Sequence, residues 1–87
     1  MELRGGGMRI AILTSSNVAS KYAATLIMRG HEVIVGDENV RAISGLEPFL
    51  ECDGCLLLGK ETELLDIAEA MQRAGKCVWR DLAKIPK

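Results

Sequence analysis

The stretch 9–37 constrains the fold more than any other part of the chain. It begins with an uninterrupted apolar run over 10–13, which is typical of a strand covered on both faces, as central strands of parallel sheets are. Apolar residues then recur at helical spacing over 18–29, and Gly30 is suited to end that helix. A second apolar run, 33–35, completes a β-α-β unit. The sequence therefore predicts a parallel sheet with helices packed on it.

The rest of the chain continues this alternation. The remaining predicted elements are two short helical pieces over 38–50, broken by Gly45 and Pro48, a strand over 55–58, a helix over 61–74 that Gly75 ends, and a strand over 76–79. Right-handed crossovers between four parallel strands favour the order 2-1-3-4. The predicted class is α/β, a three-layer Rossmann-like (flavodoxin-like) domain. We expect residues 8–87 to form this single domain and residues 1–7 to be a flexible leader.

Counting the helices indicates that one face of this sheet is only partly covered. The first crossover should cover one face and the other two crossovers the opposite face, which leaves the third and fourth strands bare near Cys77 and Trp79. Residues 80–87 hold few apolar side chains, and we expect them to be insufficient cover. A two-fold homodimer that buries Trp79 and the fourth strand is the predicted solution.

Charge and composition exclude several classes of partner. The chain has 87 residues, a net charge of −1 and only 3% aromatic residues, so we expect no binding to nucleic acid or to a membrane surface. Its apolar runs are far shorter than the roughly 20 residues that span a bilayer. The start of the chain also lacks the apolar region of a signal peptide, and we expect a cytoplasmic protein.

The cysteines and the histidine indicate neither disulfides nor a metal site. Cys52, Cys55 and Cys77 are odd in number and lie in or beside predicted strands, so we expect buried or half-buried thiols. His31 is the only histidine and is interpreted as a solvated residue at a turn. We therefore expect neither a metal ion nor another cofactor.

Polar residues gather where ligands bind in sheets of this kind, beyond the carboxyl ends of the strands. The predicted ligand-binding residues are Thr14, Ser15, Ser16, Asn17, Asp37, Lys60 and Glu61. Hydroxyl and N–H groups at the start of the first helix suit a phosphate or carboxylate, and capping of that helix explains the same residues. Asp37 stands where dinucleotide-binding folds place an acid for ribose hydroxyls, or it caps the next helical turn. The G-x-G-x-x-G fingerprint is absent, so a pyrophosphate would lack a close backbone approach.

Two segments carry a resemblance to a known family. Residues 52–79, CDGCLLLGKETELLDIAEAMQRAGKCVW, resemble the nucleoside 2-deoxyribosyltransferase-like superfamily, in which a strand after an aspartate leads to a loop, an acid-bearing helix, Gly-Lys and a last strand. The segments MRIAILTSS and AATLIMRGHEVIV are similar to that family's first strand, polar turn and second strand. The resemblance covers most of residues 8–81 in a chain of reduced size. It implies a Rossmann-like fold and a nucleotide or nucleoside ligand.

The resemblance also implies a catalytic acid. In that family a helix carboxylate attacks the anomeric carbon of the sugar. The candidate catalytic residues are Asp66 and Glu63, although an acid in a first helical turn also interacts favourably with the helix dipole. Three functions stay open: a small nucleotide- or nucleoside-binding protein, an N-glycosidic hydrolase or transferase that uses such a carboxylate, and a protein-interaction module without a small-molecule ligand.

Overall fold

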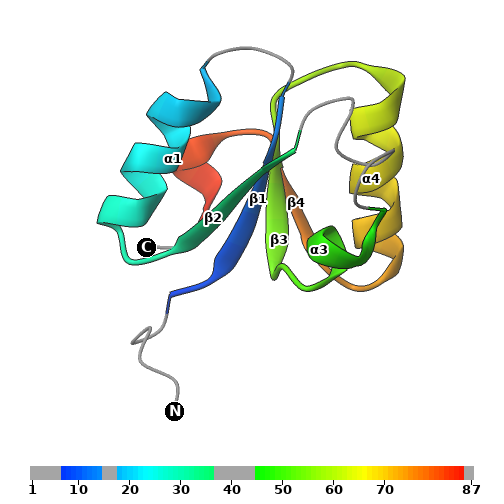
Figure 1. The fold of residues 1–87 in the computed structure, drawn as a ribbon, viewed down its shortest axis with the longest axis horizontal. Helices are drawn as coiled ribbons and strands as arrows, with labels where there is room; N and C mark the ends of the chain where they lie inside the picture. The colour runs from blue at the N-terminus through cyan, green and yellow to red at the C-terminus, as the bar shows by residue number, and fades with distance from the viewer. Residues whose placement is uncertain (1–6, 15–17, 37–44, 86–87) are drawn as a thin grey trace.

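The structure is a computed structural model that describes residues 7–14, 18–36 and 45–85. Helices and strands alternate along the chain (Figure 1), in the order β1 (Arg9–Leu13), α1 (Ala19–Met28), β2 (Glu32–Gly36), α3 (Glu47–Leu50), β3 (Gly54–Leu57), α4 (Thr62–Arg73), β4 (Cys77–Trp79) and the 3-10 turn η1 (Leu82–Lys84). The strands are parallel and their order is β2-β1-β3-β4. The predicted α/β class, the Rossmann-like layers and the order 2-1-3-4 are confirmed.

The central strand β1 is covered on both faces of the sheet. The side chains from Ile10 to Leu13 are each 0% exposed. Because successive side chains of a strand point to opposite faces, Ile10 and Ile12 join the core beside α1. Ala11 and Leu13 join the core beside α4. The apolar run that predicted a central strand thus contributes to two cores.

The helices lie on both faces of the sheet, with α1 on one face and α3 and α4 on the other (Figure 1). The buried residues of α4 are Leu64, Ile67, Ala68 and Met71, whose spacing forms one apolar stripe. Gly30 and Gly75 end α1 and α4 with φ of +92° and +84°, as predicted, because glycine has no Cβ to oppose a positive φ. None of the described helices has the length and apolar character that crossing a membrane requires.

The start of α3 differs from the prediction, whereas the predicted cap of α1 is mostly undescribed. Val18 occupies the N-cap position of α1 and makes no side-chain cap hydrogen bond, and residues 15–17 of the polar turn that was predicted to cap this helix lie outside the described residues. The sequence predicted that Pro48 breaks a helix, but Pro48 lies in the first turn of α3. Proline is tolerated there because the first N–H groups of a helix have no intrahelical partner. The helical piece predicted before Gly45 falls mainly on residues 38–44, which lie outside the described residues.

The tail after β4 covers the sheet face that the sequence predicted to be bare. η1 returns to the same side of the sheet as α1 (Figure 1). Ile85 is only 2% exposed in the core beside α1, and Leu82 and Trp79 pack against the same core. The Asp81 carboxylate accepts a hydrogen bond of 3.0 Å from the N–H of Ala83, which fixes the turn. The expectation that the tail is insufficient cover is therefore wrong, and the reason given for a dimer through Trp79 no longer holds.

Two side chains lie in surroundings that the sequence did not predict. His31 is only 5% exposed, and its Nδ1 accepts a hydrogen bond of 3.0 Å from the N–H of Met8. The prediction of a solvated histidine is thus wrong. Cys52 and Cys55 are buried thiols, as predicted, whereas Cys77 is exposed. All three cysteines are free.

Candidate functional site

The carboxyl ends of the strands meet at one edge of the sheet, because the strands are parallel. From β1 the chain crosses to β2 on one side, and β3 lies on the other side of β1. Connections therefore diverge between β1 and β3, which is where open α/β sheets bind ligands. This point is the candidate functional site.

Backbone hydrogen bonds hold the ends of three strands together at this point. The N–H of Thr14 donates to the carbonyl of Gly36 over 3.1 Å, which ties the end of β1 to the end of β2. The carbonyl of Leu13 accepts from the N–H groups of Leu58, at 2.9 Å, and Gly59, at 3.1 Å. Thr14 is only 4% exposed. These hydrogen bonds fix the positions of the strand ends that border the candidate site.

Gly59, in the loop after β3, is closely surrounded by its neighbours. A Cβ at this position would lie 2.5 Å from Oε1 of Glu61 and 3.6 Å from the Cα of Thr14. The Glu61 carboxylate therefore packs against Gly59, together with the Leu64 side chain, whose Cδ1 would also lie 2.5 Å from that Cβ. Glu61 is also the N-cap residue of α4, and its carbonyl accepts from Leu64 and Leu65 over 3.0 Å each. A carboxylate and the start of a helix come together at the point where the connections diverge.

The structure brings some of the predicted ligand-binding residues together and leaves others undescribed. Thr14 and Glu61 both lie beside Gly59, and Lys60 is an exposed residue of the same loop. The other predicted residues, Ser15, Ser16, Asn17 and Asp37, lie outside the described residues. The role of Gly59 was not predicted, and its only sequence signal was its position directly after an apolar strand.

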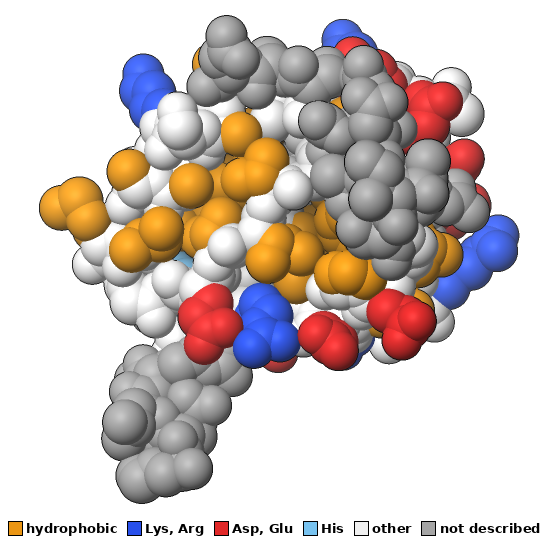
Figure 2. Space-filling model, in the orientation of Figure 1, with side chains coloured by type: hydrophobic (Ala, Val, Ile, Leu, Met, Phe, Trp, Pro, Cys, Tyr) orange, Lys and Arg blue, Asp and Glu red, His pale blue; other side chains and the backbone are white. Residues whose placement is uncertain are grey.

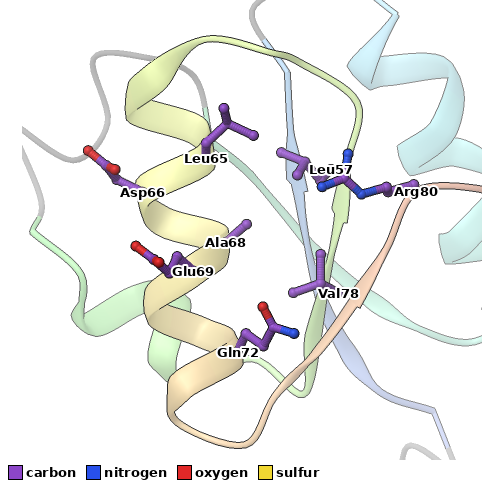
Figure 3. A pocket seen from close by; sticks show the side chains of 8 residues that line it. All are labelled: Leu57, Leu65, Asp66, Ala68, Glu69, Gln72, Val78 and Arg80. Atoms are coloured by element: carbon purple, nitrogen blue, oxygen red, sulfur yellow. The ribbon is translucent and has the colours of Figure 1, made fainter.

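A groove of about 290 Å³ lies elsewhere, between α4 and the strands β3 and β4 (Figure 3). Its lining residues are Leu57, Leu65, Asp66, Ala68, Glu69, Gln72, Val78 and Arg80. Leu65 and Ala68 point from α4 towards the sheet, whereas the carboxylates of Asp66 and Glu69 point away from it (Figure 3). The two acids therefore form the rim of the groove and do not converge inside it.

The two candidate catalytic acids are both exposed on α4. Asp66 borders the groove, and Glu63 is not among its lining residues. Glu63 lies in the first turn of α4, and Arg73 in the last, an arrangement that the helix dipole favours. In the described residues, the acid placed directly against the point of divergence is Glu61 rather than either of these two. A catalytic role for Glu63 or Asp66 stays a prediction.

The buried thiols are not activated nucleophiles. Burial raises the pKa of Cys52 to about 11 and the pKa of Cys55 to about 12. Both groups are thus protonated thiols at neutral pH, whereas the thiolate is the reactive form. The described ranges contain no group of three or more His, Cys, Asp or Glu side chains arranged to hold a metal ion.

Comparisons of the chain with protein-family models, with curated proteins and with solved structures found no match. The structure itself defines the class of protein, a small three-layer α/β domain with a Rossmann-like parallel sheet.

Proposed function

We propose that this chain is a small nucleotide- or nucleoside-binding protein of deoxyribosyltransferase-like fold, with its ligand between the carboxyl ends of β1 and β3. The observation that carries the proposal is the meeting of Thr14, Gly59 and Glu61 at that point. The site has backbone hydrogen bonds that join the strand ends, and a carboxylate that packs against Gly59.

The charges around the site favour the sugar hydroxyls of the ligand as the main point of recognition. A carboxylate accepts hydrogen bonds from hydroxyl groups, and bonds to a charged acceptor are stronger than neutral ones. In the proposed complex the Glu61 carboxylate accepts a hydrogen bond from a ribose hydroxyl. Lys60 and the first N–H groups of α4 attract a phosphate, but Glu61 and Glu63 lie at the same helix start and oppose an anion. We therefore expect nucleosides to bind at least as tightly as their triphosphates.

The proposal is tested by thermal-shift titration of the full chain with a panel of nucleosides and nucleotides. A ligand at 100 times its dissociation constant should raise the free energy of unfolding by about 2.7 kcal/mol. Glu61→Gln removes the charge and keeps the shape, and it should weaken binding by about tenfold or more, because bonds to charged groups contribute about 1.5–3 kcal/mol.

Glu47→Gln is the matched control for this substitution. Glu47, like Glu61, is an exposed acid at the start of a helix. However, α3 leads into the amino end of β3, so Glu47 lies at the end of the sheet away from the candidate site. This variant should bind as the wild type does. Stabilisation by none of the nucleosides and nucleotides, or equal binding by the Glu61→Gln variant, would contradict the proposed site.

A separate assay tests the N-glycosidic alternative. Incubation with nucleosides and nucleotide sugars, followed by chromatography for free base, detects cleavage of the glycosidic bond. Base release that is lost in Glu63→Gln or Asp66→Asn, with ligand binding retained, would assign that carboxylate as the nucleophile. Binding without base release supports the binding function proposed above.

A further inference from the structure

The β2 edge of the sheet carries a continuous apolar surface. Within the described residues β2 pairs with β1 alone, so its other side is an edge. Figure 2 shows hydrophobic side chains extending from α1 across β2. Val35 on β2 is 47% exposed, and Ile27 and Met28 at the end of α1 are 58% and 87% exposed. Large exposed apolar surfaces of this kind mark interaction sites.

The hydrogen-bonding groups of this edge belong to two valines. The N–H of Glu32 donates to Met8 over 2.8 Å, and the carbonyl of Gly36 accepts from Thr14 over 3.1 Å. Along a strand, the backbone N–H and C=O groups of one residue point to one side within the sheet, and those of the next residue point to the other side. The N–H and C=O groups of Glu32, Ile34 and Gly36 therefore point towards β1. Those of Val33 and Val35 point outwards, where another strand can pair with them.

We propose that two copies of this chain form a two-fold dimer in which β2 pairs antiparallel with β2 of the second copy, centred on Ile34. In this register Val33 of one copy exchanges both backbone hydrogen bonds with Val35 of the other, and the same pair forms again across the axis. Ile34 faces Ile34 of the second copy. The two four-stranded sheets become one continuous sheet.

The side chains of β2 are self-complementary in this register. Val33-Ile34-Val35 reads the same in both directions, so valine meets valine on one face and isoleucine meets isoleucine on the other. Branched pairs across neighbouring strands are stabilising. The one charged residue of the strand, Glu32, is opposite Gly36 of the second copy, so like charges do not meet. This symmetry identifies a second copy, rather than an unrelated peptide, as the partner.

The other edge strand of the sheet, β4, is less suited to pairing with a second copy. β4 has three residues, against five in β2, and Arg80 follows it directly. Short edge strands resist pairing. Charge borders β2 as well, with Glu32 at its start and Asp37 after it, so its advantage over β4 is its length. A contact of β2 with β4 of the next copy would not close on itself, whereas β2 with β2 does.

Cysteine cross-linking tests the register in the full chain. In a Cys77→Ser background, which removes the exposed native thiol, Ile34→Cys places two thiols opposite each other across the axis. Residues of such a pair have Cα atoms about 4.5 Å apart, within the range of a disulfide. Mild oxidation should give a covalent dimer on a non-reducing gel. Val33→Cys is the matched control, because its opposite residue is Val35 and it should give little covalent dimer.

Sedimentation at micromolar concentration tests the surface independently. The wild type should be a dimer, Val35→Lys should be a monomer, and Leu65→Lys, at an equally exposed apolar residue of α4 away from β2, should stay a dimer. If Val35→Lys fails to fold by circular dichroism, Ile27→Lys on the helix surface takes its place and should also be a monomer. A monomeric wild type, or a covalent dimer from Val33→Cys as abundant as from Ile34→Cys, would overturn the proposal. These outcomes do not depend on whether the carboxyl edge binds a nucleoside.

Discussion

Two glycines allow aromatic rings to approach the strands closely. A Cβ on Gly36 would lie 2.7 Å from the ring of Phe49, and a Cβ on Gly54 would lie 2.4 Å from the ring of Trp79. Real Cβ contacts do not occur at such distances, so each ring occupies the space that a side chain would need. Glycine in a strand often marks this kind of close approach.

Gly54→Ala should destabilise the fold by about 1–3 kcal/mol, the range for overpacking a filled core. The new methyl group would meet the Trp79 ring and also lie 2.9 Å from the backbone oxygen of Cys77, which cannot move without disturbing β4. Urea unfolding followed by circular dichroism measures the loss. Trp79 is the only tryptophan, so its fluorescence reports displacement of the ring directly.

The control for Gly54→Ala is a double-mutant cycle with Trp79→Leu. Removing ring atoms relieves part of the clash, so the double variant should lose less stability than the two single losses added together. Additive losses would show that the ring does not occupy the space beside Gly54.

At the scale of single elements, the tail is the part of the chain that completes the core beside α1. η1 is only three residues long, but it positions Ile85 against that core. Its turn depends on the hydrogen bond from Ala83 to Asp81. A short segment thus covers an area of sheet that a further helix would otherwise cover.

Ile85→Ala should lower the free energy of unfolding by about 2–5 kcal/mol, because truncating a buried isoleucine loses apolar burial and leaves a cavity. Lys84→Ala is the control, since Lys84 is exposed and such substitutions change stability by about 0.5 kcal/mol or less. Chemical unfolding of the two variants measures both values. Equal, small effects would mean that the tail is not part of the core.

At the scale of the whole molecule, the buried thiols couple stability to pH. Folding raises the pKa of Cys52 to about 11 and of Cys55 to about 12 through burial, from an ordinary value of 9.0. The folded state therefore holds these protons more tightly than the unfolded state does. The resulting stabilisation is fully present below pH 9 and is lost as the pH rises towards 12.

The urea concentration at the midpoint of unfolding should accordingly decrease as the pH is raised from 9 to 11. The informative quantity is the difference between the wild type and a Cys52→Ala, Cys55→Ala double variant, because only this difference isolates the two thiols. The double variant should be less sensitive to pH over this interval. In the native wild type, iodoacetamide should modify the exposed Cys77 well before the other two thiols. Parallel pH profiles, or equal rates at the three cysteines, would contradict the burial of these thiols.

The sequence by itself determined the order of strands and helices and the topology of the sheet. The apolar run of β1, the helical spacing in α1 and α4 and the glycines that end these helices are local patterns. Chain connectivity then restricts how parallel strands can be ordered. The carboxyl-edge rule placed Thr14 and Glu61 on the same side of the sheet for the same reason.

Tertiary structure alone decided the contacts between residues that are distant in the chain. The Nδ1 of His31 became an acceptor because β1 brings Met8 beside it. Thr14 lies beside Gly59 because β1 and β3 are neighbours in the sheet. Gln72 and Arg80 line one groove only because β4 packs beside α4. The apolar run of β1 predicted its own burial, but the partners of His31, Glu61, Gln72 and Arg80 depend on what distant segments place around them.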